Sequence, residues 1–200
     1  MLFCPYYIGL FFLSLLFQER IVKLYMRSDW VYKDTFNHVL SALTWPNRLA
    51  VETSLATGLR ISDVLSLKTE TVRNLSRFTV TELKTGKKRK IRLPNALRDD
   101  LIAISGKIYV FTGRLDCRKH RTRQAVFKDI KRAQRAFRIK NLNISPHSAR
   151  KIYAVSKYQK YQDLSKVKAL LNHDNEAVTL IYALADQITL SREKGEQVKH

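Results

Sequence analysis

Residues 57–67 read TGLRISDVLSL, a stretch that places a helix end, a short connection and a new helix around one arginine, Arg60. The preceding residues, 47–57, carry apolar side chains at helical spacing, and Pro46 suits the first turn of that helix. Gly58 permits the left-handed conformation that commonly ends a helix. The stretch therefore predicts that Arg60 stands directly between two packed helices.

Ser62 is expected to cap the second, short helix over residues 63–67, with Asp63 at its positive end. For Asp63 two interpretations stay open. It either orients Arg60 or another site residue, or serves only as an N-terminal helix charge.

The rest of the chain continues this pattern and predicts an α+β fold that is mainly α, with a small antiparallel sheet or hairpin. Gly86, in the turn at residues 85–87, supplies the positive φ that a hairpin needs. Helices are predicted over 34–43, 95–104, 122–138, 147–160, 164–172 and 175–185, and strands over 75–83, 88–93 and 108–112.

The charge balance is unusual for a chain of 200 residues. Thirty-seven Lys and Arg face 17 Asp and Glu, which gives a net charge of +20. This excess is more than solubility requires and indicates a polyanionic partner, most simply double-stranded DNA. An anionic membrane is the competing partner, but the basic residues do not gather on one amphipathic helix.

The two cysteines, Cys4 and Cys117, form no CxxC pair and no spacing typical of metal ligands. They are expected to be free thiols in a reducing cytoplasm, and neither a metal site nor a cofactor is predicted.

Three segments are expected along the chain. Residues 1–25 begin with an uncharged, Phe- and Leu-rich run that is short for a membrane span and is interrupted by Pro5 and Gly9. It is either an apolar helix that packs on the domain or a partner, or sequence from a start codon placed too early. Residues 26–190 form one catalytic domain, and residues 191–200 form a polar tail.

Six residues are candidates for catalysis of phosphodiester chemistry: Arg60, Lys84, His147, Arg150, His173 and Tyr182. Two arginines suit the phosphate, because each guanidinium stays charged and can hold two oxygens. The histidines can hydrogen-bond or move a proton, and a lysine can protonate the leaving 5′-oxygen. A tyrosine hydroxyl can act as nucleophile if positive charge or a base lies near it.

The contexts of these residues resemble the tyrosine recombinase (phage integrase) family. TGLRISDVLSL is similar to the family's first arginine segment, ELKTGKK to its lysine hairpin, PHSARK to its H-x-x-R segment, and LLNH followed by Tyr182 to its closing segment. Two departures are Asn172, where the family usually has Gly, and Ala149-Arg150-Lys151, where it often has Leu-Arg-His.

The resemblance implies a site-specific DNA recombinase or integrase of a phage or other mobile element. DNA strands would be cleaved and rejoined through a 3′-phosphotyrosine without metal, by four protomers assembled on DNA. A full-length recombinase or accessory DNA-bending proteins are further partners that we expect. If Lys84 is not the catalytic lysine of the hairpin, Lys87 is the alternative.

Contacts with DNA are predicted for six other basic residues of the hairpin and of the helix over 122–138: Lys87, Lys88, Arg89, Lys128, Arg132 and Arg135. Two other functions stay open. The chain is a catalytically idle DNA-binding module that regulates a full-length recombinase, or it relaxes supercoils as a type IB topoisomerase does.

Overall fold

The computed structural model describes residues 28–29 and 31–171, and this part is mainly helical. In chain order its elements are α2 (Lys33–Ser41), α3 (Trp45–Thr57), α4 (Ile61–Leu65), α5 (Thr69–Asn74), β1 (Arg77–Thr81), β2 (Lys88–Arg92), α6 (Asn95–Ile104), α7 (Arg123–Ala136), α8 (Pro146–Tyr161) and α9 (Leu164–Leu171). The predicted fold class, mainly α with a small antiparallel hairpin, is confirmed.

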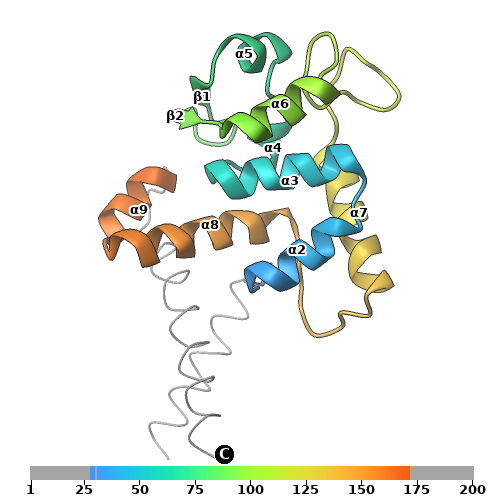
Figure 1. The fold of residues 1–200 in the computed structure, drawn as a ribbon, viewed down its shortest axis with the longest axis vertical. Coiled ribbons are helices and arrows are strands. Elements are labelled where there is room, and N and C mark those ends of the chain that lie inside the picture. Colours follow the sequence, from blue (N-terminus) through green and yellow to red (C-terminus); the bar gives the residue numbers. More distant parts are fainter. Residues whose placement is uncertain (1–27, 30, 172–200) are drawn as a thin grey trace, which may run out of the picture.

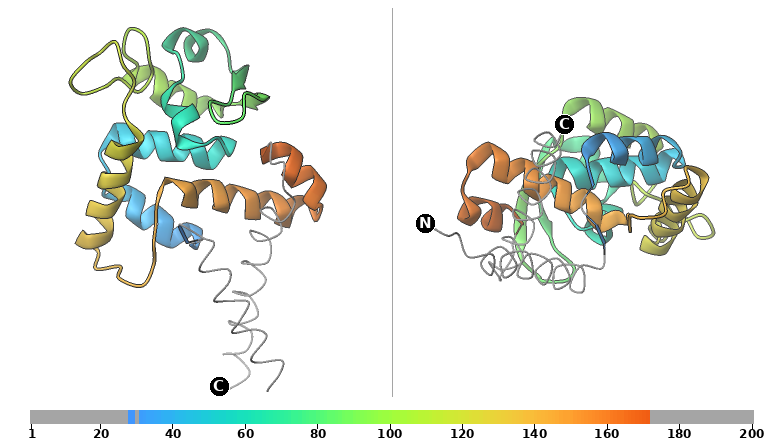
Figure 2. Two further views of the ribbon diagram at one scale, coloured as in Figure 1. Left: turned by 180° about the vertical axis from the view of Figure 1, so that it is seen from behind. Right: turned by 90° about the horizontal axis from the view of Figure 1, so that it is seen from below.

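The pair α3 and α8 lies at the centre of the fold (Figure 1). Helix α7 packs on α3 and α8 at one end of this pair, and α9 folds back on α8 at the other, as both views in Figure 2 also show. Gly58 ends α3 with φ +70°, as its position in the sequence predicts. Arg60 follows the end of α3 and His147 lies in the first turn of α8, so the segments that carry them both adjoin this central pair.

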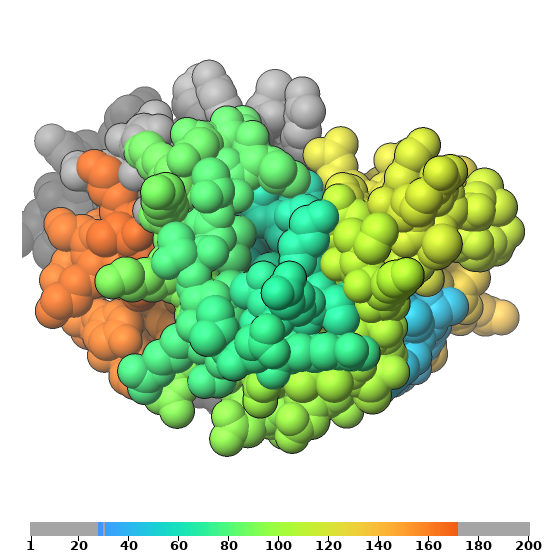
Figure 3. Space-filling view, turned by 90° about the horizontal axis from the view of Figure 1, so that it is seen from above, coloured from blue at the N-terminus to red at the C-terminus, as the bar shows by residue number. Residues whose placement is uncertain are grey.

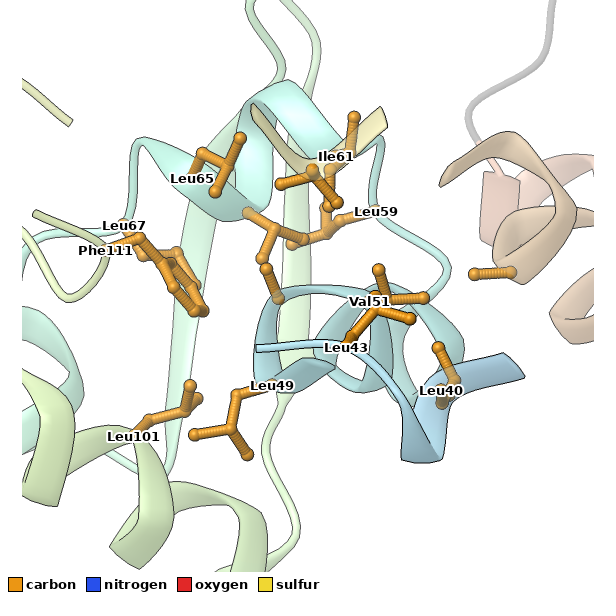
Figure 4. Packing of buried hydrophobic residues seen from close by; sticks show 14 of the residues in the cluster. Leu40, Leu43, Leu49, Val51, Leu59, Ile61, Leu65, Leu67, Leu101 and Phe111 are labelled. Carbon is orange, nitrogen blue, oxygen red and sulfur yellow. The ribbon is translucent and has the colours of Figure 1, made fainter. Parts of the chain in front are cut away.

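Buried apolar side chains hold α3 to α6 and to the segments around α4 (Figure 4). Leu49 of α3 lies against Leu101 of α6, while Leu65 and Leu67 approach Phe111. All five side chains are at most 5% exposed, so they form continuous core rather than surface packing. This core fixes the position of α4, and with it the residue that precedes α4, Arg60.

The hairpin β1–β2 is antiparallel, with Phe78 opposite Ile91 and Val80 opposite Arg89. Alternate residues face inward on both strands. Gly86 has φ +67° in the turn, as predicted. Both strands are shorter than the predicted ranges.

The predicted strand over 108–112 is wrong. Tyr109 and Thr112 form only isolated bridges, with Lys68 and His120 respectively. The backbone of Val110 donates to Leu67, but the chain next to Leu67 turns into α5 at once. With no extended partner beyond that point, a ladder cannot form. Helix α5 itself was not predicted.

The start of α4 also differs from the prediction. The helix begins at Ile61, and Arg60 rather than Ser62 occupies the capping position, with extended backbone angles. Ser62 cannot be the capping residue, because it already lies within the helix: the backbone N–H groups of Asp63 and Val64 both donate to the Arg60 carbonyl oxygen. Arg60 is therefore fixed by the helix that it starts.

From above, the hairpin and its neighbours (green) and the loop before α7 (yellow-green) form two lobes with the α4–α5 segment (teal) between them (Figure 3). Within residues 28–29 and 31–171, no helix is long and apolar enough to cross a membrane. The predictions for residues 1–25, for a helix over 175–185 and for the tail 191–200 lie outside the described residues.

Candidate active site

Arg60 lies at the junction of α3 and α4, directly after the left-handed turn at Gly58. Its side chain is 15% exposed and forms an ion pair with Glu82, a carboxylate with no exposed surface. Because the guanidinium has five N–H donors, this ion pair leaves others free to bind an anion from solvent.

Helix α8 begins with a complete capping box. Ser145 Oγ accepts from the backbone N–H of His147, and Ser148 Oγ accepts from the backbone N–H of Ser145. Pro146 occupies the first turn, where no N–H is required. This capping box fixes where α8 begins and in which direction it runs, and so it sets the positions of His147 and Arg150 near the start of the helix.

Arg150 is 4% exposed and bridges two distant backbone segments. Its Nη1 donates to the carbonyl oxygen of Gly58 at 2.6 Å, and its Nη2 donates to that of Leu171 at 2.6 Å. Hydrogen bonds of this kind from an ionised donor are stronger than neutral ones. Arg150 thus joins the segment of Arg60 to the end of α9, from which the chain continues toward His173.

His147 is accessible to solvent, but the protein around it partly desolvates the ring, and its setting is strongly cationic. Desolvation lowers its pKa, and the charges of Arg123, Arg150, Lys151 and Arg60 lower it further. The imidazole is therefore neutral at pH 7 and can accept a proton. The same charges favour a bound phosphate.

Asp63 is fully buried beneath this cluster. Burial raises its pKa, while the hydrogen bond from Leu83 N–H lowers it, as do the charges of Arg60 and Arg150. Asp63 Oδ1 accepts from Leu83 N–H at 2.9 Å, so this carboxylate holds the lysine hairpin. This contact favours the first of the two interpretations of Asp63.

Lys84 lies in the hairpin turn, and its side chain is exposed. The residues on each side of it are fixed: Leu83 by Asp63, and Thr85 by a hydrogen bond from its Oγ1 to Glu82 Oε2 at 3.0 Å. Glu82 is the ion-pair partner of Arg60. The hairpin turn is therefore attached to the arginine segment, while the Lys84 stem extends into solvent.

The structure thus brings Arg60, His147 and Arg150 together and places Lys84 in the adjoining turn. His173 and Tyr182 lie outside the described residues.

Two residues that support the site, Glu82 and Arg89, were not recognised as such from the sequence. The signal that could have found them is a charged residue at an inward-facing position, within β2 for Arg89 and directly after β1 for Glu82, in segments where apolar residues alternate with polar ones.

Five of the six residues predicted to contact DNA have exposed side chains: Lys87, Lys88, Lys128, Arg132 and Arg135. The sixth, Arg89, does not fit this prediction, because its guanidinium is buried and donates to the carbonyl oxygens of Thr57 and Gly58. It points inward because alternation in β2 puts it on the same face as Ile91.

A cavity of about 980 Å³ lies between the start of α3, the loop over 113–122 and the start of α7. Arg121, Lys128 and Arg132 are among its lining residues. Asp129 lies at its base and accepts hydrogen bonds from Thr44 and Asn47, which holds α7 to α3.

The chain enters the fold beside α8. Lys151 donates to the carbonyl oxygen of Ser28, and Ser148 Oγ donates to that of Asp29 at 2.7 Å. Asp29 also exchanges hydrogen bonds with the backbone of Asn143. We call this group of contacts the entry clasp.

Known proteins share this sequence and arrangement. The model of the phage integrase family matches residues 30–187. The probable integrase/recombinase YoeC of Bacillus subtilis is 29% identical over 136 residues, which is 66% of this chain and 74% of that protein. The tyrosine recombinase of Thermosipho africanus is 29% identical over 181 residues, which is 86% of this chain and 61% of that protein.

Among solved structures, the XerH site-specific recombinase bound to a palindromic difH substrate aligns with a TM-score of 0.65 at 19% identity. The alignment covers 84% of this chain and 53% of that one. The chain thus spans about half to two thirds of the length of the Thermosipho africanus recombinase and of XerH. The fold is the same, and, by the match over residues 30–187, the chain belongs to the phage integrase family of tyrosine recombinases.

Proposed function

We propose that this protein is a site-specific DNA recombinase of a phage or other mobile element, which cleaves and rejoins strands through a 3′-phosphotyrosine at Tyr182. The observation that carries the proposal is that Arg60, from the junction of α3 and α4, lies near His147 and Arg150 of α8, with the buried carboxylates of Asp63 and Glu82 beside them. A family match that continues through residue 187 supports the assignment of Tyr182.

In the proposed reaction, Arg60 and Arg150 bind the non-bridging oxygens of the scissile phosphate and stabilise the charge that builds there. The tyrosine oxygen forms a bond to phosphorus as the bond from phosphorus to the 5′-oxygen breaks. Neutral His147, with His173, accepts the tyrosine proton, and Lys84 gives a proton to the leaving 5′-oxygen. Reversal by another 5′-hydroxyl rejoins the strands, and neither step consumes ATP or a metal ion.

Double-stranded DNA is the proposed partner, and the exposed cations Lys87, Lys88, Lys128, Arg132 and Arg135 are proposed to contact its phosphates. Such contacts position the duplex rather than select its sequence. Recombination of two duplexes would require assembly of several protomers, four in the simplest scheme.

Covalent capture tests the proposal. The protein is incubated, in EDTA, with nicked duplexes taken from the DNA that flanks its coding sequence, and is then denatured. Wild type should give a protein–DNA adduct with a free 5′-hydroxyl on the released strand. Tyr182→Phe should bind the same DNA without forming adduct, while Tyr161→Phe, at an exposed tyrosine of α8, should form it as wild type does.

Adduct from Tyr182→Phe would refute the assignment of the nucleophile. Tight, salt-sensitive binding without adduct from wild type would instead support the idle DNA-binding module. Relaxation of a supercoiled plasmid without recombinant product would support the topoisomerase.

A further inference from the structure

Arg89 is buried although its neighbours on β2 face solvent. Lys88 and Lys90 are exposed, whereas the Arg89 side chain is 7% exposed and lies on the inward face of the hairpin. A buried guanidinium is costly unless its charge and its N–H groups are matched by partners. The groups that contact the Arg89 guanidinium therefore indicate its structural role.

Those contacts reach three separate segments. The guanidinium donates to the carbonyl oxygens of Thr57 and Gly58, the latter at 3.2 Å, at the end of α3. Its Nη1 lies 3.9 Å from Glu82 Oε1 in its own hairpin. Its central carbon lies 5.8 Å from the centre of the Tyr153 ring on α8, within the range of a cation–π contact.

Gly58 is the shared point of these contacts. Its carbonyl oxygen accepts from Arg89 and also from Arg150 at 2.6 Å. Arg89 therefore links β2 to the same atom that Arg150 uses to hold the arginine segment.

Glu82 completes the connection to the hairpin turn. One of its oxygens accepts from Arg60 and from Thr85 Oγ1, and the other faces Arg89. Thr85 directly follows Lys84. The pair formed by Arg89 and Glu82 thus lies between the arginine that binds phosphate in the proposed reaction and the lysine that protonates the leaving group.

We propose that Arg89 is a positioning residue that sets where Lys84 stands relative to the scissile phosphate, by fixing the hairpin to the end of α3 and to α8. The proposal rests on the proposed function above, and it assigns Arg89 to neither DNA nor the reacting atoms. Loss of Arg89 should therefore slow the step that needs the lysine proton, and not the binding of DNA.

The chemistry of the leaving group provides a selective test. When a phosphate with a bridging 5′-oxygen is cleaved, the oxygen leaves with a proton from Lys84 Nζ. If sulfur replaces that bridging oxygen, it leaves as a thiolate without needing a proton, because the pKa of a thiol, about 8.5, is far below that of an alcohol. A defect in proton delivery is thus removed by sulfur, whereas a defect in phosphate binding or folding remains.

The experiment measures adduct formation on matched nicked duplexes with either bridging atom. Lys84→Ala, the reference, should be slowed by about 100-fold or more on oxygen and restored with sulfur, as expected for loss of a general acid. Arg89→Met should be slowed by at least about tenfold on oxygen and come within about threefold of wild type on sulfur. Arg77→Met, at an exposed position of β1 far from the turn, should leave the ratio of the two rates unchanged.

Thr85→Val is the milder variant if Arg89→Met fails to fold. It removes the hydrogen bond to Glu82 and a longer one, 3.4 Å, from the backbone N–H of Lys87, with little change of shape. It should lower the ratio of the oxygen to the sulfur rate in the same direction by a few-fold.

The outcomes separate the hypotheses. If wild type forms no adduct with either bridging atom, the proposed function fails, and this inference with it. If Lys84→Ala is not restored by sulfur, the assigned acid is wrong. If Lys84→Ala is restored but Arg89→Met is equally slow on both duplexes, or Thr85→Val leaves the ratio unchanged when Arg89→Met does not fold, the positioning role of Arg89 is overturned.

Discussion

The Nη1 atom of Arg150 lies 2.6 Å from the carbonyl oxygen of Gly58, two residues before Arg60. Two candidate phosphate-binding arginines are thereby linked through one backbone atom. The direction of that carbonyl depends on the positive φ of Gly58 and on the ring of Tyr153 packed against it. Gly58 and Tyr153, which are not among the candidate catalytic residues, therefore help to decide the relative placement of the two guanidinium groups.

Gly58→Ala should destabilise the protein more than Gly86→Ala does, although both glycines have φ near +70°. A Cβ at residue 58 would lie 2.5 Å from the Tyr153 ring, whereas a Cβ at residue 86 would have no heavy atom within 4 Å apart from its own residue and the two that adjoin it. Backbone strain alone is worth about 1–2 kcal/mol, and the clash adds about 1–3 kcal/mol at residue 58. Urea unfolding of the two variants measures the difference. Equal losses of stability in the two variants would show that the Tyr153 ring moves aside without an energetic penalty.

Lys151→Met should change the dependence of stability on pH. Burial lowers the pKa of Lys151 from 10.5 to about 8. Because this folded pKa is below the unfolded one, the unfolded chain binds more protons between these values, and the contribution of Lys151 to stability rises with pH from about 8 to 10.5. The free energy of unfolding of wild type minus that of Lys151→Met should therefore increase across this range, by up to roughly 3 kcal/mol.

Denaturant titrations of both proteins at several pH values between 7.5 and 10.5 measure that difference. Lys160→Met, at an exposed lysine of the same helix, is the matched control. A difference that stays constant with pH would contradict the burial of a charged lysine in the entry clasp.

His147 should titrate below its ordinary value of 6.5 in the free protein, and Arg123→Gln should move its pKa upward. Desolvation lowers this pKa first and the charge of Arg123 second, so removal of that charge removes part of the shift. NMR titration of the His147 ring proton measures both values. Arg135→Gln makes the same charge change at the far end of α7, and an equal shift in that variant would indicate only a general effect of net charge.

Asp129→Asn should destabilise the protein by about 1–3 kcal/mol at neutral pH, because one oxygen of Asp129 accepts from both Thr44 and Asn47 and the other from Arg132. Burial would raise the pKa of Asp129, but these hydrogen bonds lower it below 3.8. Its stabilising contribution is thus present above pH 3.8 and is lost as the pH falls through the folded pKa.

Thermal unfolding between pH 7 and pH 3 should show a smaller loss of stability for Asp129→Asn than for wild type. Asp99→Asn, at an exposed position of α6, should behave like wild type at neutral pH. A neutral-pH effect of Asp129→Asn as small as that of Asp99→Asn would argue against the connection of α7 to α3 through Asp129.

Much of this arrangement could be predicted because local rules determine it. The glycines at 58 and 86, the proline at 46 and the apolar spacing of α7 each act over a few residues. The segment 108–112 could not be assigned in this way, because its strand character depended on a partner, Leu67, whose neighbours turn into a helix. The prediction of a strand was wrong at the segment whose secondary structure depends on pairing with a distant part of the chain.

In the candidate site, too, local sequence patterns could be interpreted, whereas contacts between distant segments could not. Arg60, His147 and Arg150 stand in contexts that indicate their chemistry, and so the sequence predicts them as one group of candidates. Arg89 was assigned to DNA because it stands in a run of basic residues, and the alternation of inward and outward positions along the strand was not applied to that run. Its true environment depends on the register of the hairpin and on Tyr153, a residue of a distant helix.

The entry clasp has a mechanical consequence. Ser28 and Asp29 are fastened to Lys151 and Ser148, one turn of helix or less from His147 and Arg150. Tension applied to the chain ahead of residue 28 would reach the first turn of α8 directly, without passing through the hydrophobic core. The geometry around Arg150, a candidate phosphate-binding arginine, is thus connected to any force that acts on residue 28.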